Sequence, residues 1–457
     1  MYSKSKNINY FCKISILPIL IFGGCATYHP RLLPMDADLV SGVEQLNGHD
    51  TALHERQDGL SLDEVAVFAV LNNPALKARR KQLGIKQAEL YAEGLLPDPQ
   101  LSASIDHPNG NLPDLFNGYG IGLGYDFIPL ITRGARLDSA QEAQKQARLE
   151  ILWQEWQVSQ RARVLAVDLD SQQKQVVLLE EMRKLYEERY RRSYEAVSHG
   201  DITLSVAGTD LTAMLDTLSR ISQLQQSVND ILHELKLLLG LSSNSPLKIS
   251  LTPLSDMPDV SIWRKKFQTL PHRRPDLLAL KAGYQSQEAR VRAAILSQFP
   301  SLSIGINRAS DTSNVHSTGF SIDFNLPLFS GNRGAIAIER ATREQLAAEY
   351  QARLDETATE IDRLIRLQGI VSGQMVQLDE YVPVLKSMVG HGRAAYGKGD
   401  IDAVTFLNME STWVGKRLEQ IDLAKTQRTN LIALQTLLAL PTEGKSMVNE
   451  IPGGIKP

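Results

Sequence analysis

The second half of the chain repeats the pattern of the first half. Short motifs recur in the same order at an offset of roughly 200 residues, far longer than the period of a solenoid repeat. Leu- and Ala-rich helices alone would not reproduce the proline and glycine positions, so duplication is favoured over coincidence. We expect repeats over 60–250 and 251–441. The paired motifs are NNPALKARRKQ from Asn72 and RRPDLLALKAG from Arg273, GLLPDPQLSAS from Gly94 and SQFPSLSIGI from Ser297, YDFIPLITRGAR from Tyr125 and IDFNLPLFSGNRG from Ile322, HGDITLS from His199 and KGDIDAV from Lys398, and LKLLLGLSS from Leu235 and LQTLLALPT from Leu434.

Each repeat predicts the same order of elements: a helix, two short strands, a very long helix, a glycine break and another long helix. Residues from about 134 to 198 contain no proline and are mainly Ala, Leu, Glu, Gln and Arg, which form helices well. At about 1.5 Å per residue this helix would be near 100 Å long. The other long helices are expected over about 203–239, 331–398 and 403–439, with a kink at Pro383 in the 331–398 helix.

The long helices are amphipathic. Apolar residues recur at helical spacing with charged residues between them, so each helix would bury a stripe and expose the rest. In the first long helix the stripe consists of Leu165, Leu169, Val176, Leu179 and Met182.

Four short segments alternate between apolar and polar residues, which is typical of strands with one apolar face. A half-buried sheet of a soluble protein has the same pattern. Strands facing lipid are favoured because the segments approach the roughly nine residues of a tilted membrane strand, and because no further segment is left to cover the apolar face. The apolar positions are Leu101, Ala103 and Ile105; Tyr119, Ile121, Leu123, Tyr125 and Phe127; Leu302, Ile304 and Ile306; and Phe320, Ile322, Phe324 and Leu326.

Four strands cannot close a barrel in a membrane. The smallest membrane barrels have about eight strands, and an open edge in lipid leaves backbone groups unpaired at several kcal/mol each. The chain must therefore assemble with copies of itself. We expect a mainly helical fold whose four strands join those of two other copies in a 12-stranded barrel, with the helices extending it as a tunnel.

The N-terminus resembles an export signal. Basic residues precede a short apolar run over 14–22, and Gly23 and Gly24 then precede Cys25. Small residues before a cysteine resemble the lipobox of bacterial lipoproteins, although Phe22 is larger than usual there. We expect a signal peptide over 1–24, acylation of Cys25 and an extended segment over 25–59. The alternative is an ordinary signal peptide with Cys25 incidental. A disordered tail is expected over 442–457.

Composition argues against several other classes of protein. A formal charge of −3, from 49 basic and 52 acidic residues, does not indicate nucleic-acid binding. The nine histidines show no metal-site spacing, and we find no set of nucleophile, base and orienting residue. The glycines of GYGIGLGYD lie inside a predicted strand and not at a strand-to-helix turn, so a phosphate loop is not favoured. We expect neither an enzyme nor a bound cofactor or metal.

The duplicated order of elements resembles the TolC-like outer-membrane efflux factor family. The NNP and RRP helix starts, LLPDP and FP before strands, IPL and LPLFSGNRG after strands, and the tyrosine–glycine turns carry the resemblance over roughly 60–441. The family implies a homotrimer in the outer membrane, a periplasmic adaptor and an inner-membrane pump of the RND type. The lipoprotein start is more similar to the branch that serves heavy-metal or general proton-driven pumps.

The resemblance implies a passive export duct for small solutes such as metal ions or drugs. It leaves open a duct for polypeptides or polysaccharides. A different class of protein, a periplasmic coiled-coil adaptor or scaffold, usually has one helical hairpin between β domains, whereas two hairpins are predicted here.

The glycine turns would lie at the periplasmic tip, where candidate adaptor contacts are His199, Gly200, Asp201, Lys398, Gly399, Asp400 and Asp402. Asp201 and Asp402 would alternatively only cap the next helices. The paired aspartates of the family prototype's entrance fall on Thr405 and Asn408 here, so the acidic ring is not reproduced. Asp210, Asp402 or Glu410 could substitute, or an apolar constriction could form, and the candidate gate residues are Thr405, Phe406, Leu407 and Asn408.

Overall fold

The computed structural model describes residues 28–48, 59–109, 115–251, 263 and 266–439. The expected signal peptide, Cys25 and the tail over 442–457 lie outside these residues. The chain divides into two units, Met1–Leu39 and Val40–Pro457. In the first unit, residues 28–39 contain no helix or strand. All the elements below belong to the second unit.

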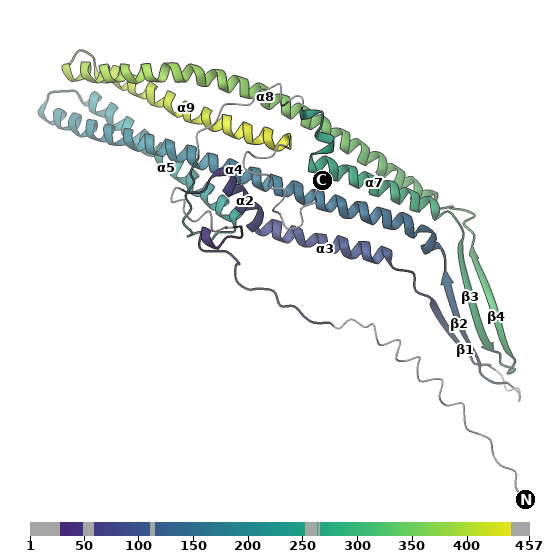
Figure 1. Ribbon diagram of the computed structural model, residues 1–457. Helices are drawn as coiled ribbons and strands as arrows, with labels where there is room; N and C mark the ends of the chain where they lie inside the picture. The colour runs from purple at the N-terminus through teal and green to yellow at the C-terminus, as the bar shows by residue number, and fades with distance from the viewer. Residues whose placement is uncertain (1–27, 49–58, 110–114, 252–262, 264–265, 440–457) are drawn as a thin grey trace, which may run out of the picture. The chain divides into compact units, whose positions relative to one another are not determined.

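The duplication is confirmed by the order of the elements (Figure 1). After the short 3-10 helix η1 (Val43–Gln45), the first repeat contains α2 (Leu62–Asn72), α3 (Pro74–Gly94), β1 (Gln100–Asp106), β2 (Gly118–Asp126), α4 (Ile128–His199) and α5 (Leu204–Leu239). The second repeat contains η3 (Leu270–His272), α7 (Pro275–Leu296), β3 (Ser301–Ser310), β4 (His316–Asn325), α8 (Arg333–Lys398) and α9 (Ala403–Leu437).

Several helix boundaries differ from the sequence-based expectation, each for a local reason. Helix α4 starts before Gly134 because Pro129 fits its first turn, where a missing N–H costs no hydrogen bond. Helix α8 starts after Gly331 because Gly331 and Asn332 adopt left-handed φ angles of 49° and 55°. Pro383 lies inside α8, and the helix continues through it.

The four strands form one antiparallel sheet in the order β1-β2-β3-β4. Its register places Leu101, Leu123, Ile306 and Phe320 opposite one another in a row. The adjacent row, on the other face, consists of Ser102, Gly122, Asn307 and Gly319. The predicted alternation is confirmed: the sheet has one apolar face and one face of small and polar residues.

The apolar face of the sheet is exposed. Leu101 is 74% exposed and Phe320 is 62% exposed, so neither is covered within the chain. β1 and β4 form the two edges of the sheet. All four strands extend from the ends of α3, α4, α7 and α8, at the end of the helices opposite to the glycine turns (Figure 1).

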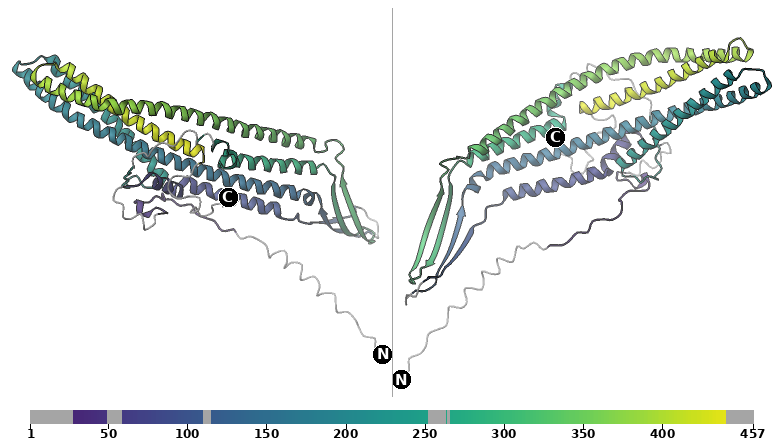
Figure 2. Two further views of the ribbon diagram at one scale, coloured as in Figure 1. Left: turned by 45° about the horizontal axis from the view of Figure 1, so that its top comes forward. Right: turned by 180° about the vertical axis from the view of Figure 1, so that it is seen from behind.

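Each repeat forms its own apolar core, in which its two long helices pack with a shorter helix that precedes the strands. In the first repeat, Phe68 of α2 packs with Leu165 of α4 and Leu239 of α5. In the second repeat, Leu277 of α7 packs with Leu364 of α8 and Leu434 of α9. The long helices lie side by side, with α5 and α9 each paired to the long helix before it (Figure 2).

The predicted stripe on α4 is buried at Leu165, Leu169, Leu179 and Met182, and Val176 is half-buried. In the part of the chain that the structure describes, no helix has both the length and the apolar composition that crossing a bilayer requires.

Candidate functional site at the helix turns

The two glycine turns lie at the same end of the helices (Figure 1), and their backbone conformations are nearly identical. Gly200 ends α4 with φ of 79°, and Gly399 ends α8 with φ of 80°. Each glycine amide donates to a carbonyl of the preceding helical turn. This left-handed geometry favours glycine, as expected for a tight reversal.

The charged residues of both turns are exposed. His199, Asp201, Lys398, Asp400 and Asp402 all face solvent, and the His199 ring nitrogen Nδ1 lies 2.8 Å from the Glu195 carbonyl oxygen. These side chains are thus accessible to another protein.

The suggested role as N-cap of the following helix is confirmed for Asp402, and it is wrong for Asp201. The Asp402 carboxylate accepts a 2.6 Å hydrogen bond from the Thr405 amide, and this bond lowers the pKa of Asp402. In contrast, α5 starts later, with Thr203 as its N-cap residue, and receives no capping bond from a side chain. Asp201 therefore lies in the turn and not at the helix start.

The four candidate gate residues divide into exposed and internal positions on α9. Thr405 and Asn408 are exposed, Leu407 is half-buried, and Phe406 is only 3% exposed. The Phe406 ring stacks on Tyr396 of α8, with ring centroids 5.4 Å apart. Of the four candidate gate residues, Thr405 and Asn408 are therefore the ones whose side chains are accessible on the surface of α9.

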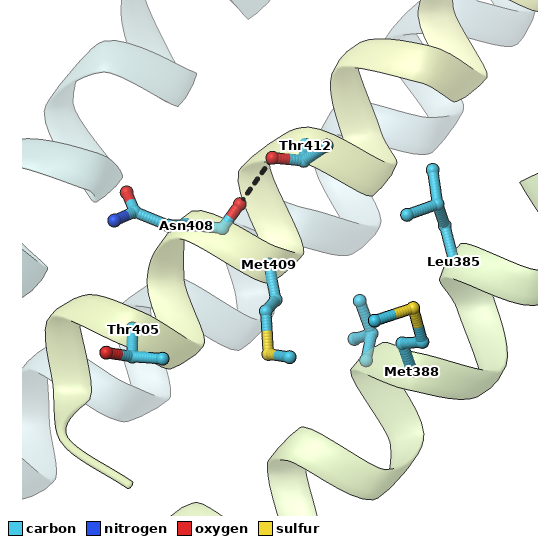
Figure 3. A pocket seen from close by; sticks show the side chains of 7 residues that line it. Leu385, Met388, Thr405, Asn408, Met409 and Thr412 are labelled. Atoms are coloured by element: carbon cyan, nitrogen blue, oxygen red, sulfur yellow. Dashed lines mark hydrogen bonds between the residues drawn. The ribbon is translucent and has the colours of Figure 1, made fainter.

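An open groove of about 340 Å³ runs between α8 and α9 beside these residues (Figure 3). The Met409 side chain extends from α9 toward α8, and the Thr412 hydroxyl donates to the Asn408 carbonyl within α9. The groove is lined by Leu385, Met388, Val389, Thr405, Asn408, Met409 and Thr412.

A buried cluster of charges lies next to the gate residues, and the sequence analysis did not find it. Arg189 of α4 lies 2.7 Å from Asp210 of α5 and 2.9 Å from Glu410 of α9. The side chains of Asp210 and Glu410 are 1% and 3% exposed. Arg393 of α8, which is half exposed, lies 3.2 Å from the other oxygen of Glu410.

The Arg189 contacts differ in kind. Arg189 donates a hydrogen bond to Glu410. Its Nε atom and the Asp210 carboxylate are close but not aligned for a hydrogen bond, so attraction between opposite charges holds that contact. Asp210 and Glu410 were considered as pore-lining acids from the sequence, and the structure instead buries both inside the chain.

Aromatic rings surround the Arg189 guanidinium. Its central carbon lies 5.0 Å from the Tyr186 ring centroid and 5.9 Å from that of Phe406, within the range of cation–π attraction. Burial, with a smaller contribution from Glu410, raises the pKa of Tyr186 to about 12. Burial also raises the pKa of Tyr396. The site is therefore a polar centre inside an apolar shell that joins both repeats.

Comparison with known proteins finds similar sequences and structures. The sequence model described as Outer membrane efflux protein matches residues 267–440, which comprise the second repeat. The second repeat of this chain is thus similar to the outer membrane efflux protein family. The chain is 24% identical over 273 residues to the cation efflux system protein CusC of Escherichia coli K12. That match covers 58% of this chain and 53% of CusC, so the chain spans about half the length of this curated relative.

Two further proteins are similar to this chain. The probable outer membrane lipoprotein SilC of Salmonella typhimurium is 20% identical over 176 residues, covering 36% of this chain and 38% of SilC. The crystal structure of CusC matches with a TM-score of 0.69 and 18% identity, over 83% of this chain and 92% of that chain. The likeness to this structure shows that the chain has the TolC-like fold.

The buried charge cluster results from the packing of the two repeats. Arg189 and Asp210 come from the first repeat, and Glu410, more than 200 residues further along the chain, comes from the second. Acidic and basic residues are frequent throughout the sequences of the long helices, so no local signal distinguished these residues. Among the described residues, no group of three or more His, Cys, Asp or Glu side chains is placed to hold a metal ion.

Proposed function

We propose that this chain is one protomer of a homotrimeric outer-membrane channel, which serves as the passive exit duct of a tripartite efflux pump. The carrying observation is the four-stranded sheet, with its exposed apolar face and its two unpaired edges. The sheet extends beyond helices long enough to reach far into an aqueous compartment.

The sheet edges support assembly with identical copies. Exposed apolar residues such as Leu101 and Phe320 would face lipid, and the small residues of the opposite face would face a wet lumen. In lipid, the unpaired backbone groups of β1 and β4 require strand partners. Pairing of β1 with β4 of the next copy satisfies them, and three copies give the twelve strands of one closed barrel.

The N-terminal segment supports a location in the outer membrane. Gly23 and Gly24 before Cys25 fit acylation of that cysteine after signal cleavage, and the relative SilC is named a probable outer membrane lipoprotein. Cys25 would anchor each protomer, with the long helices in the periplasm.

Metal cations are the proposed class of exported solute, because the relative CusC is named a cation efflux system protein. The energy would come from an inner-membrane pump of the RND type, reached through a periplasmic adaptor. The adaptor would contact the exposed turn residues His199, Gly200, Asp201, Lys398, Gly399, Asp400 and Asp402. Thr405 and Asn408 would narrow the entrance, with Phe406 and Leu407 supporting them from the protein interior.

The assembly is tested with the mature protein purified in detergent and added to planar lipid bilayers. We expect a particle mass of three protomers and stepwise pore conductance. A monomer that stays soluble without detergent and conducts no ions would refute the proposal.

The solute class is tested by deleting the gene and measuring growth in metal salts, dyes and antibiotics. We expect increased sensitivity to metal salts, restored by the intact gene. Sensitivity only to dyes or antibiotics would reassign the solute class, and no change for any compound would argue against efflux.

A further inference from the structure

We propose that Met388 of α8 and Met409 of α9 form a binding site for soft monovalent metal ions, Cu(I) or Ag(I), in the groove between these helices. The ion would be bound in passing, as cargo and not as a resident cofactor. The use of this site in export rests on the proposed function, whereas the binding itself does not.

The two helix pairs that end at the glycine turns are equivalent residue by residue. α4 ends at His199 and α8 ends at Lys398. After the turns, α5 starts at Leu204 and α9 starts at Ala403. Both differences are 199 residues, so the offset between the repeats is the same on the two sides of the turn. Side chains that meet across one helix pair therefore have counterparts that meet across the other.

Met388 and Met409 are the counterparts of an ion pair. Their equivalent residues in the first repeat are Arg189 and Asp210, whose charged groups lie 2.7 Å apart across α4 and α5. The second repeat thus has two thioethers where the first repeat has a contact between opposite charges. In agreement with this, Met388 and Met409 line the same groove between α8 and α9 (Figure 3).

The Met409 sulfur lies against the backbone of α8 at Gly392. A Cβ atom at Gly392 would lie 3.0 Å from that sulfur, so the missing side chain leaves room for it. Met388 precedes Gly392 by about one helical turn, which rises about 5.4 Å. Because methionine side chains are long and flexible, two sulfurs at this spacing can reach one ion.

The two methionines are accessible from solvent. Met388 is 47% exposed and Met409 is half-buried, and the groove of about 340 Å³ is open. Thr405 and Asn408, the two exposed candidate gate residues, line the same groove. An ion held by the sulfurs would therefore lie beside the proposed entrance of the duct.

The chemistry of the groove favours soft ions over hard ones. Thioether sulfur suits Cu(I), whereas Mg²⁺ and Ca²⁺ bind through several oxygen ligands. Among the described residues that line the groove, none carries a carboxylate, an imidazole or a thiol. Thioethers are also a different class of ligand from the His, Cys, Asp and Glu groups, which form no metal site in the described chain.

The charges next to the groove favour a monovalent ion. Glu410 follows Met409, and its two carboxylate oxygens are already paired with Arg189 and Arg393. The Glu410 side chain is only 3% exposed, so it does not serve as a ligand in the groove. A single positive charge is repelled less by Arg393 than a double charge would be.

The first test is titration of the mature protein in detergent with silver nitrate in chloride-free buffer. Methyl NMR of ¹³C-labelled methionines reads each sulfur separately, and Ag(I) avoids oxidation of the probe. We expect the methyl signals of Met388 and Met409 to shift together, at an Ag(I) concentration about tenfold below that which shifts Met35. Met35 is fully exposed and controls for unspecific binding to a thioether. Shifts of Met388 and Met409 that come no earlier than that of Met35 would overturn the site.

Replacement by leucine removes one sulfur and keeps the volume of the side chain, so the variants should fold. We expect Met388→Leu or Met409→Leu to weaken Ag(I) binding by about tenfold or more, because mutation even of a residue behind a ligand has that effect. Met375→Leu, on the same helix but outside the groove, is the control and should bind as the parent does. Unchanged binding in Met388→Leu and Met409→Leu would overturn the site.

The second test measures growth in silver and copper salts after deletion of the gene. We expect the parent gene to restore growth, and the gene with Met388→Leu and Met409→Leu to restore it only at lower metal concentrations. Tolerance equal to that of the parent would overturn the use of the site in export. A parent gene that restores no tolerance would instead contradict the proposed function, and the titration would then decide the site by itself.

Discussion

At the scale of single residues, Arg189 of α4 connects α4 to α5 and α9 near the glycine turns. It is the one cation that bridges two buried carboxylates from different repeats among the ion pairs of the described chain. The rings of Tyr186 and Phe406 lie close to its guanidinium. Because a buried charge is stable only while paired, this side chain supports α4, α5 and α9 at once.

Replacing Arg189 by methionine should lower the free energy of unfolding by about 3–5 kcal/mol, since Asp210 and Glu410 lose their shared cation in the interior. The triple variant Arg189→Met, Asp210→Leu and Glu410→Met should regain most of that loss, because it removes the carboxylates as well. Denaturant unfolding in detergent, followed by helical circular dichroism, measures both. An Arg189→Met protein as stable as the parent would show that the cluster contributes nothing.

Tyr186 makes the tip sensitive to alkaline pH. Its pKa is raised from 10.0 to about 12 by burial, so folding favours the neutral phenol. The resulting stability is complete below pH 10, the pKa of the exposed phenol, and is lost as the pH rises toward 12. The loss would reach about 2–3 kcal/mol, at 1.36 kcal/mol for each pH unit.

The measurement is thermal unfolding of the parent and of Tyr186→Phe between pH 9 and about 12. The free energy of unfolding of the parent, relative to that of Tyr186→Phe, should fall over this range. Only the parent has a phenol that ionises more readily in the unfolded chain. A difference that does not vary with pH would contradict the assignment.

At the scale of elements, the strands have two faces of different chemistry in one register. Leu101 and Ser102 are neighbours on the edge strand β1 and point to opposite faces. Leu101 belongs to the exposed apolar row and Ser102 to the small polar row. The same substitution at each position therefore places one charge on either face of the sheet at nearly the same depth.

Leu101→Arg should disfavour membrane insertion by about 2–4 kcal/mol if the apolar face contacts lipid near the bilayer centre. Ser102→Arg should insert normally, since the same charge would face the wet lumen. Membrane fractionation and trimer yield compare the two variants. Equal yields would mean that the two faces have similar surroundings.

At the scale of the whole molecule, the chain would be held in the membrane twice, by acyl chains at Cys25 and by the strands. A single acyl chain gives only marginal binding, whereas a closed barrel is fixed by backbone hydrogen bonds and apolar burial. The Cys25→Ser variant separates the two contributions.

We expect the exported Cys25→Ser protein to stay in the detergent phase after Triton X-114 partitioning and in the membrane after alkaline washing. The parent protein is the control. Release of the variant into the aqueous phase would show that the strands do not reside in lipid.

The sequence by itself determined the class of fold and the duplication. Proline-free helical stretches, period-two alternation and glycine turns are local signals, because neighbouring residues set backbone conformation. They correctly placed the four strands and the turns at Gly200 and Gly399. The helix boundaries near Pro129 and Gly331 were less accurate. Pro129 lies in the first turn of α4 and does not precede the helix. Gly331 and Asn332 have left-handed φ angles and precede α8.

Only the tertiary structure decided which polar and aromatic residues are internal. Phe406, Asp210 and Glu410 have the same local setting as many exposed residues of the long helices, and their burial depends on how α4, α5, α8 and α9 pack. The partner of a buried carboxylate, here Arg189, is selected by distance in space. Sequence separation carries no information about that distance until the helices are packed, and for this reason the charge cluster was beyond sequence analysis.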